Sequence, residues 1–249
     1  MKKSKLTDYT KISPNQSGER NHTVDRITPH SIVGQMSVEA LGDWFAKKST
    51  QASSNYGIGH DGRVGLYVSE DCRSWCSSSG ANDNRAITIE CACDPKSPYT
   101  VHDVVYKKLI VLCVDICKRY GKTKLIWIPD KDKALAYKPK SNEMLLTVHR
   151  WFADTTCPNK WIMDHMDDIA EKVTAKLKRV YRIQIGYFKK KENAERLVRQ
   201  IASHGYNAAI TRDDEFYRVV YGKYSSKAKA EKVQAELTKH GYRSIIING

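Results

Sequence analysis

The C-terminal part of the sequence repeats itself, and the length of the repeat leaves few folds open. Residues 181–186 read Tyr-Arg-Ile-Gln-Ile-Gly and residues 217–222 read Tyr-Arg-Val-Val-Tyr-Gly, an offset of 217 − 181 = 36. At the same offset His204-Gly205-Tyr206 recurs as His240-Gly241-Tyr242. Within each copy an alternating apolar segment precedes apolar residues at helical spacing, and a glycine follows them. Each copy therefore predicts a strand, a helix and a further strand.

Two such units predict a small α+β domain with the ferredoxin-like order βαββαβ. Its four antiparallel strands would carry both helices on one face and leave the other face open. We expect this domain at residues 181–249, after a short basic linker at 176–180. Because side chains alternate along a strand, Arg182 and Gln184 should point to the open face, with Arg218 as the equivalent of Arg182 in the second copy.

The first strand of this domain resembles the signature of the SPOR domain, which is an aromatic residue, Gln-aliphatic-Gly and a second aromatic residue. The matching positions are Tyr181, Gln184, Ile185, Gly186 and Phe188. The resemblance covers about residues 179–249. It implies binding to peptidoglycan glycan strands that have lost their stem peptides, with Gln184, Arg182 and Arg218 as glycan-binding residues.

RNA is an alternative partner, because the strand order also resembles that of RNA-recognition folds. Such folds need aromatic side chains on the open sheet face for base stacking. Here Tyr181, Tyr217 and Tyr221 alternate with the open-face positions, so we expect them to face the helices. The sequence therefore predicts no nucleic-acid partner.

Charge is unevenly distributed along the chain. The formal net charge is +14; residues 178–249 hold 16 Lys and Arg against 7 Asp and Glu, or +9, which leaves +5 for residues 1–177. A basic domain attracts nucleic acid, anionic membranes or anionic wall polymers, and charge does not rank these. No segment approaches the roughly 20 apolar residues of a membrane span, and no signal-peptide core follows Met1-Lys2-Lys3. We expect no membrane partner and synthesis in the cytoplasm without a signal peptide.

Residues 1–175 predict a separate α/β domain with a mixed sheet and flanking helices. Residues 87–89 and 125–128 have the composition of buried strands, and a wide apolar face at helical spacing predicts a helix from about 101 to 120. A further helical segment runs from about 161 to 177. The chain has seven cysteines, an odd number that favours free thiols or metal ligands over a disulfide framework.

Three residues are candidate metal ligands. His149 and Cys157 are 157 − 149 = 8 residues apart, and His30 follows a short strand that begins near Asp25. An imidazole and a thiolate suit zinc, and a hydrolytic zinc needs three protein ligands and one open position. Taken alone, a His and a Cys at this spacing are more often ordinary core or surface residues than metal ligands.

Together with their surroundings these residues resemble the type 2 N-acetylmuramoyl-L-alanine amidases, the group of phage endolysins and peptidoglycan recognition proteins. The resemblance covers roughly residues 20–175 and includes Asn55–Gly62, Trp75 and Asn84–Glu90 in the expected order. It implies zinc bound by His30, His149 and Cys157. It also implies Glu90 as the general base, with Tyr56 and Thr155 as hydrogen-bonding catalytic groups.

The implied reaction is zinc-dependent hydrolysis of the amide bond between N-acetylmuramic acid and L-alanine in bacterial peptidoglycan. By analogy the protein would be an endolysin or autolysin that reaches the wall after release from the cytoplasm. The rival is a peptidoglycan-binding protein of the same fold without hydrolysis; such proteins usually lack the cysteine ligand. Three positions depart from the family pattern and put the shape of the substrate groove in doubt: Ser31, Cys76 and Asn159.

Other candidate residues have simpler explanations. His60 and Cys76 are alternative metal ligands or neighbours of the ligands, or else residues of turn and loop surfaces, and we favour the surface role. Cys91 and Cys93 point to the same side of a strand, where packing is the favoured role.

Overall fold

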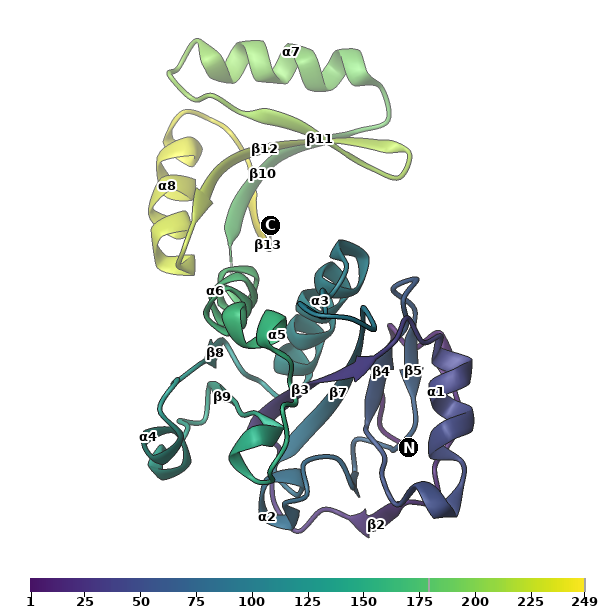
Figure 1. The fold of residues 1–249 in the computed structure, drawn as a ribbon. Coiled ribbons are helices and arrows are strands. Elements are labelled where there is room, and N and C mark those ends of the chain that lie inside the picture. The colour runs from purple at the N-terminus through teal and green to yellow at the C-terminus, as the bar shows by residue number, and fades with distance from the viewer. Residues whose placement is uncertain (179, 249) are drawn as a thin grey trace. The chain divides into compact units, whose positions relative to one another are not determined.

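The computed structural model describes residues 1–178 and 180–248, and it divides the chain into two compact units, Met1–Leu177 and Lys178–Gly249. Figure 1 shows a mixed sheet with helices in the first unit and a smaller sheet with two helices in the second. Both match the fold class predicted from the sequence. None of the helices in the described ranges is long and apolar enough to cross a membrane.

The first unit is built on a seven-stranded sheet of order β1-β5-β4-β7-β3-β9-β8. Among the described residues, β4 and β5 are the one antiparallel strand pair of this sheet; they form a hairpin, and Gly62 has φ +82° in its turn. The strands are β1 (Tyr9–Thr10), β3 (Arg26–Val33), β4 (Tyr56–Ile58), β5 (Val64–Leu66), β7 (Ala86–Cys93), β8 (Lys124–Ile126) and β9 (Glu143–Leu146). A separate ribbon pairs β2 (Gln16–Glu19) with β6 (Cys72–Ser74).

Helices and short 3-10 turns connect these strands. The predicted helix 101–120 is α3 (Asp103–Arg119), whereas the predicted helix 161–177 is two helices that break at His165. The helices are α1 (Val38–Phe45), α2 (Gly80–Asp83), α3, α4 (Lys131–Ala136), α5 (Lys160–Asp164) and α6 (Met166–Leu177), with 3-10 turns at Lys48–Thr50 and His149–Trp151.

The two faces of the central sheet differ in chemistry. Strands β3 and β7 pair in parallel register, so Ile27 lies beside Ile87 and His30 lies beside Glu90. The isoleucines pack into the apolar core with α3, which covers that face (Figure 1). Because side chains alternate, the opposite face carries His30 and Glu90.

That opposite face is largely a buried polar layer. Thr28 hydrogen-bonds to Thr147 at 2.8 Å, Ser74 to Thr88 at 2.8 Å, and Asn82 donates to Thr28 at 3.1 Å. Paired polar groups of this kind can be buried at little cost. The layer therefore fixes β3, β7 and β9 around the position of His30 and Glu90.

The second unit has the predicted βαββαβ order and an antiparallel sheet of order β11-β12-β10-β13. Its core is built from repeat-equivalent pairs: Ile183 and Val219 on strands, Ala194 and Ala230 on helices, and Ile201 and Leu237 in the last turn of each helix. The elements are β10 (Tyr181–Phe188), α7 (Lys191–Ala202), β11 (Ala209–Asp213), β12 (Phe216–Tyr224), α8 (Lys227–Lys239) and β13 (Ile245–Asn248).

Candidate metal centre and binding surface

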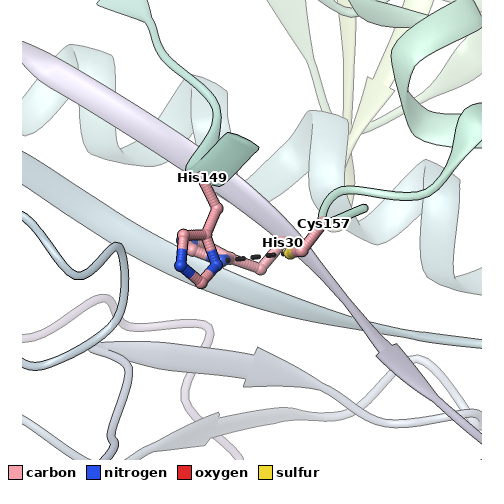
Figure 2. Close-up of side chains that lie close together, drawn as sticks. All are labelled: His30, His149 and Cys157. Atoms are coloured by element: carbon pink, nitrogen blue, oxygen red, sulfur yellow. Dashed lines mark hydrogen bonds between the residues drawn. The ribbon is translucent and has the colours of Figure 1, made fainter. Parts of the chain in front are cut away.

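The three candidate ligands lie together. The ligand atoms of His30, His149 and Cys157 are all within 4.8 Å of one another, and Figure 2 shows the three side chains converging from separate segments. The Nδ1 of His30 is 3.4 Å from the Sγ of Cys157. Two ligands of one tetrahedral zinc lie roughly 3.3–3.8 Å apart, since each bond is about 2.0–2.3 Å long. The cluster needs only a small contraction to hold one ion.

Local hydrogen bonds bring the cysteine to the histidines. The 3-10 turn that carries His149 is bound to the loop that follows it, because the backbone N–H of Arg150 donates to the carbonyl of Cys157 at 2.8 Å. The far end of the loop is tied to β3, where the N–H of Asn159 donates to the Oγ of Ser31 at 2.9 Å. Ser31 and Asn159 both depart from the family pattern, and here they bind each other. These two departures therefore support the position of Cys157.

Two buried atoms of the centre are unsatisfied. His30 is 1% exposed, and within the described residues neither its Nε2 nor the Oε2 of Glu90 has a hydrogen-bond partner. Buried polar atoms without a partner are costly and call for a ligand, a water or an ion. Two imidazoles and a thiol with such atoms beside them fit a zinc ion.

The pKa values of the cluster residues are also consistent with a bound zinc ion. Burial, and next the neighbouring His149, lowers the pKa of His30 to about 3, so its imidazole is neutral as a ligand must be. Burial, and next the charge of Glu90, raises the pKa of Cys157 to about 12. A thiolate at this position therefore requires a nearby cation.

Glu90 lies on β7 directly beside His30 in the parallel register. Burial raises the pKa of its carboxyl to about 7, close to the value at which a group can both accept and return a proton at neutral pH. The Sγ of Cys76 lies 3.8 Å from its Oε1. A carboxylate of this kind beside a metal cluster has the properties of a general base.

Cys76 lies at this centre, so the structure favours the alternative role beside the ligands over the preferred expectation of a loop surface. It is half-buried, and its Sγ lies within 4.8 Å of ligand atoms of His30 and Glu90. The carboxylate of Asp83 holds the loop by accepting hydrogen bonds from the N–H groups of Cys76 and Ser77, at 3.1 and 3.0 Å. The sequence signal was its place directly after Trp75, at a position that departs from the family pattern. His60, by contrast, is exposed in the turn between β4 and β5.

Tyr56 does not lie at the centre. In the register of β4 and β7 it sits beside Ile89, so its side chain enters the apolar core on the other face of the sheet. Its hydroxyl donates to Glu70 at 2.6 Å and accepts from the N–H of Ser4 at 2.7 Å. The implied catalytic role of Tyr56 is therefore corrected to a structural one.

Thr155 lies two residues before the ligand cysteine and is partly buried. Its Oγ1 accepts a hydrogen bond from the backbone N–H of Cys157 at 3.2 Å. Its position keeps it next to the cluster, and its hydroxyl helps to shape the cysteine loop.

A cavity of about 400 Å³ opens beside the cluster, with His149 and Cys76 in its wall. Trp75 and Arg73 also line it, and both side chains are anchored on the hydroxyl of Ser17. The Oγ of Ser78 is 3.3 Å from the Nε2 of His149. The cavity thus places an aromatic and a cationic side chain next to the candidate metal centre.

The predicted glycan-binding residues lie on the open face of the second sheet. Ile183 is fully buried toward the helices, so Arg182 and Gln184 on either side of it face the opposite way. Gln184 pairs with Val220 across the strands, and Arg218 pairs with Tyr187. The structure therefore places Arg182, Gln184 and Arg218 on one surface.

That surface also carries aromatic side chains that the sequence reasoning missed. Tyr187 stacks on Phe216 with ring centroids 4.6 Å apart and an angle of 9° between the rings. The guanidinium of Arg218 lies 5.6 Å from the centre of the Tyr187 ring and pairs with Asp213. Tyr181, Tyr217 and Tyr221 pack against the core, as predicted.

The first unit is thus a mixed α/β domain that carries a His, His and Cys cluster beside a partly buried glutamate. Residues 20–160 match the family model described as N-acetylmuramoyl-L-alanine amidase, and since this is more than half of the chain, the protein belongs to that family. Residues 177–248 match the SPOR domain. Both resemblances stated from the sequence are thereby confirmed.

Similar solved structures cover the two units separately. The peptidoglycan-binding domain of the Bacillus subtilis cell wall lytic enzyme CwlC is 32% identical over 28% of this chain and 90% of that chain, with a TM-score of 0.27. The amidase LysC from Clostridium intestinale URNW is 17% identical over 69% and 94%, with a TM-score of 0.45. The Staphylococcus aureus hydrolase AmiA in complex with its ligand is 12% identical over 68% and 82%, with a TM-score of 0.49. No curated protein matches the chain.

Proposed function

We propose that this amidase is zinc-dependent and cleaves the bond between N-acetylmuramic acid and L-alanine in bacterial peptidoglycan. The observation that carries the proposal is the convergence of His30, His149 and Cys157 beside the buried carboxyl of Glu90. The three ligands would hold the ion and leave one position open. When bound, zinc supplies a Lewis acid for the amide carbonyl and for the attacking water.

The chain's own residues supply the proton transfers and the binding site. Glu90 accepts the proton of the attacking water and returns it to the leaving amine of L-alanine, which its pKa of about 7 permits. The cavity with Trp75 and Arg73 is the proposed groove for the substrate. Trp75 is 38% exposed, so it can contact a sugar ring or a peptide there.

The second unit is proposed to hold the enzyme on the wall. Its open face offers Arg182, Gln184 and Arg218 for hydrogen bonds, and the stacked pair Tyr187 and Phe216 for contact with sugar rings. Its excess of positive charge also suits anionic wall polymers. We further propose that the protein works as an endolysin or autolysin, made in the cytoplasm and acting on the wall after release.

The direct test is to digest purified cell walls with the protein, with and without a chelator, and to identify the new chain ends. We expect free amino groups of L-alanine that disappear with the chelator and return with added zinc. New reducing sugar ends would instead identify a glycosidase and contradict the proposal. Binding to walls without any new ends would support the non-catalytic alternative.

Cys157→Ser tests the ligand assignment. We expect this variant to lose bound zinc and activity while still binding glycan through the second unit. Cys72→Ser is the matched control, because Cys72 is also half-buried and free but belongs to neither ligand cluster. An unchanged zinc content in Cys157→Ser would refute the assignment.

A further inference from the structure

A second group of potential ligands lies beside the first. His30 of β3, Cys76 of the loop after β6 and Glu90 of β7 have ligand atoms that are all within 4.8 Å of one another. His30 is shared with the first cluster, whereas Cys76 and Glu90 are additional. The chain therefore gathers four further metal-binding side chains around the buried imidazole of His30.

The contacts within this second group leave ligand atoms free. The Cys76 thiol meets Glu90 Oε1 at 3.8 Å, a weak contact, while the other carboxylate oxygen is buried and has no partner in the described part of the chain. The two nitrogens of His30 also differ. Nδ1 is 3.4 Å from Cys157, and Nε2 is buried without a partner among residues 1–178 and 180–248. His30 thus has one nitrogen that the contact with Cys157 does not use.

We propose that His30, Cys76 and Glu90 form a second cation site that takes zinc or another thiophilic divalent ion. A thiolate, a carboxylate and an imidazole are all ligands of Zn²⁺, and the thiolate disfavours Mg²⁺ and Ca²⁺. His30 gives one ring nitrogen to each ion. When the second ion binds, two protons are released to solvent: the thiol proton of Cys76 and the remaining ring N–H proton of His30, which then bridges the two ions as an imidazolate.

Occupation of this site would inhibit the enzyme, and this part of the inference rests on the proposed function. A cation bound to Glu90 occupies the carboxylate oxygens that must accept the proton of water. It also lowers the proton affinity of the carboxylate. Excess zinc is therefore expected to reduce activity, although the first equivalent of zinc supports it.

The test measures zinc bound to the full-length protein by equilibrium dialysis over rising free zinc. We expect two ions per wild-type chain, and one ion in Cys76→Ser and in Glu90→Gln, each with circular dichroism like that of the wild type. Cys72→Ser is the matched thiol control and should bind two. With Co²⁺ in place of zinc, the second equivalent should add thiolate-to-metal absorption in the wild type and none in Cys76→Ser.

The outcomes separate this inference from the proposed function. One zinc per wild-type chain, unchanged in Cys76→Ser, overturns the second site and leaves the first intact. No bound zinc in the wild type overturns both. Inhibition by excess zinc that is equally strong in Cys76→Ser and the wild type contradicts the regulatory part, because the inhibiting ion would then bind elsewhere.

Discussion

The raised carboxyl pKa of Glu90 makes the stability of the folded protein depend on pH. Its carboxyl pKa rises from the usual 4.5 to about 7 because the group is buried. Below about pH 4.5 both folded and unfolded chains carry the proton. Between there and about pH 7 the unfolded chain releases it while the folded chain keeps it, so stability falls as the pH rises. Above about pH 7 the carboxyl is ionised in both states, and the full cost of its burial lowers the free energy of unfolding.

In metal-free protein, replacing Glu90 by Gln removes this pH-dependent cost. The gain in the free energy of unfolding from Glu90→Gln should therefore be larger at pH 8 than at pH 4. The difference should reach up to about 3 kcal/mol, since one pKa unit corresponds to about 1.4 kcal/mol. Urea unfolding in the presence of a chelator at both pH values measures it. Because any packing effect of the amide is the same at each pH, a difference that does not change with pH would contradict the raised pKa.

Tyr56 shows what sequence order cannot determine. The residues His30, His149 and Cys157 could be chosen from the sequence because their types suit zinc and their surroundings resemble the amidase family. Tyr56 was matched to the same family through a strand motif, and a shift of one residue turns a strand side chain to the other face. The register beside Ile89 puts it in the core.

Tyr56→Phe is expected to reduce stability and to leave catalysis within about twofold of the wild type. It removes two buried hydrogen bonds, to Glu70 and Ser4, which together cost about 1–3 kcal/mol. Urea unfolding and kcat/KM on a soluble muropeptide measure the two effects. A fall of about 100-fold or more in kcat/KM with unchanged folding would return Tyr56 to the active site.

At the level of elements, the sequence predicted those helices and strands that belong to a long apolar periodicity or to the internal repeat. The wide apolar face of α3 and the offset of 36 in the second unit gave a helix and a βαββαβ order that the structure contains. The break at His165 was not predictable, because the apolar pattern continues through it. There the ring of His165 stacks on Trp161 at 3.8 Å, a contact that depends on tertiary packing.

A register shift explains why the open-face aromatics were missed. Simple alternation from Ile183 and Ile185 would turn Tyr187 toward the helices. The pairing of β10 with β12 shifts between Gln184 and Gly186, so Tyr187 is instead 42% exposed and Phe188 packs on the core. Tyr187 and Phe216 are thus not among the residues on which the prediction against RNA rests, which are Tyr181, Tyr217 and Tyr221.

Replacing the stacked pair should weaken binding to glycan strands. Tyr187→Ala and Phe216→Ala are each expected to lower affinity about 2- to 10-fold, since an aromatic contact contributes about 0.5–1.5 kcal/mol. Co-sedimentation with peptidoglycan that lacks stem peptides measures it, with Lys229→Ala on the exposed side of α8 as the control. If single-stranded RNA binds with equal or higher affinity and loses it in the same variants, the glycan assignment is wrong.

At the scale of the whole molecule, each unit has its own apolar core. The core of residues 1–177 includes Ile27 and Leu109, and that of the second unit is centred on Ile183 and Val219, with no residue shared among those described. Separate cores predict separate unfolding transitions, because the cooperativity of a domain depends on its shared core. They also predict that damage to one core spares the chemistry of the other unit.

Ile183→Ala tests this independence. Ile183 is fully buried, so its truncation should cost about 2–5 kcal/mol in the second unit. We expect the second unit to unfold at lower urea concentration, binding to cell walls to fall, and hydrolysis of a soluble muropeptide to stay at the wild-type rate. Tryptophan fluorescence follows the first unit alone, since all five tryptophans lie before residue 178. A tryptophan transition that moves together with the loss of wall binding would show that the two units unfold as one.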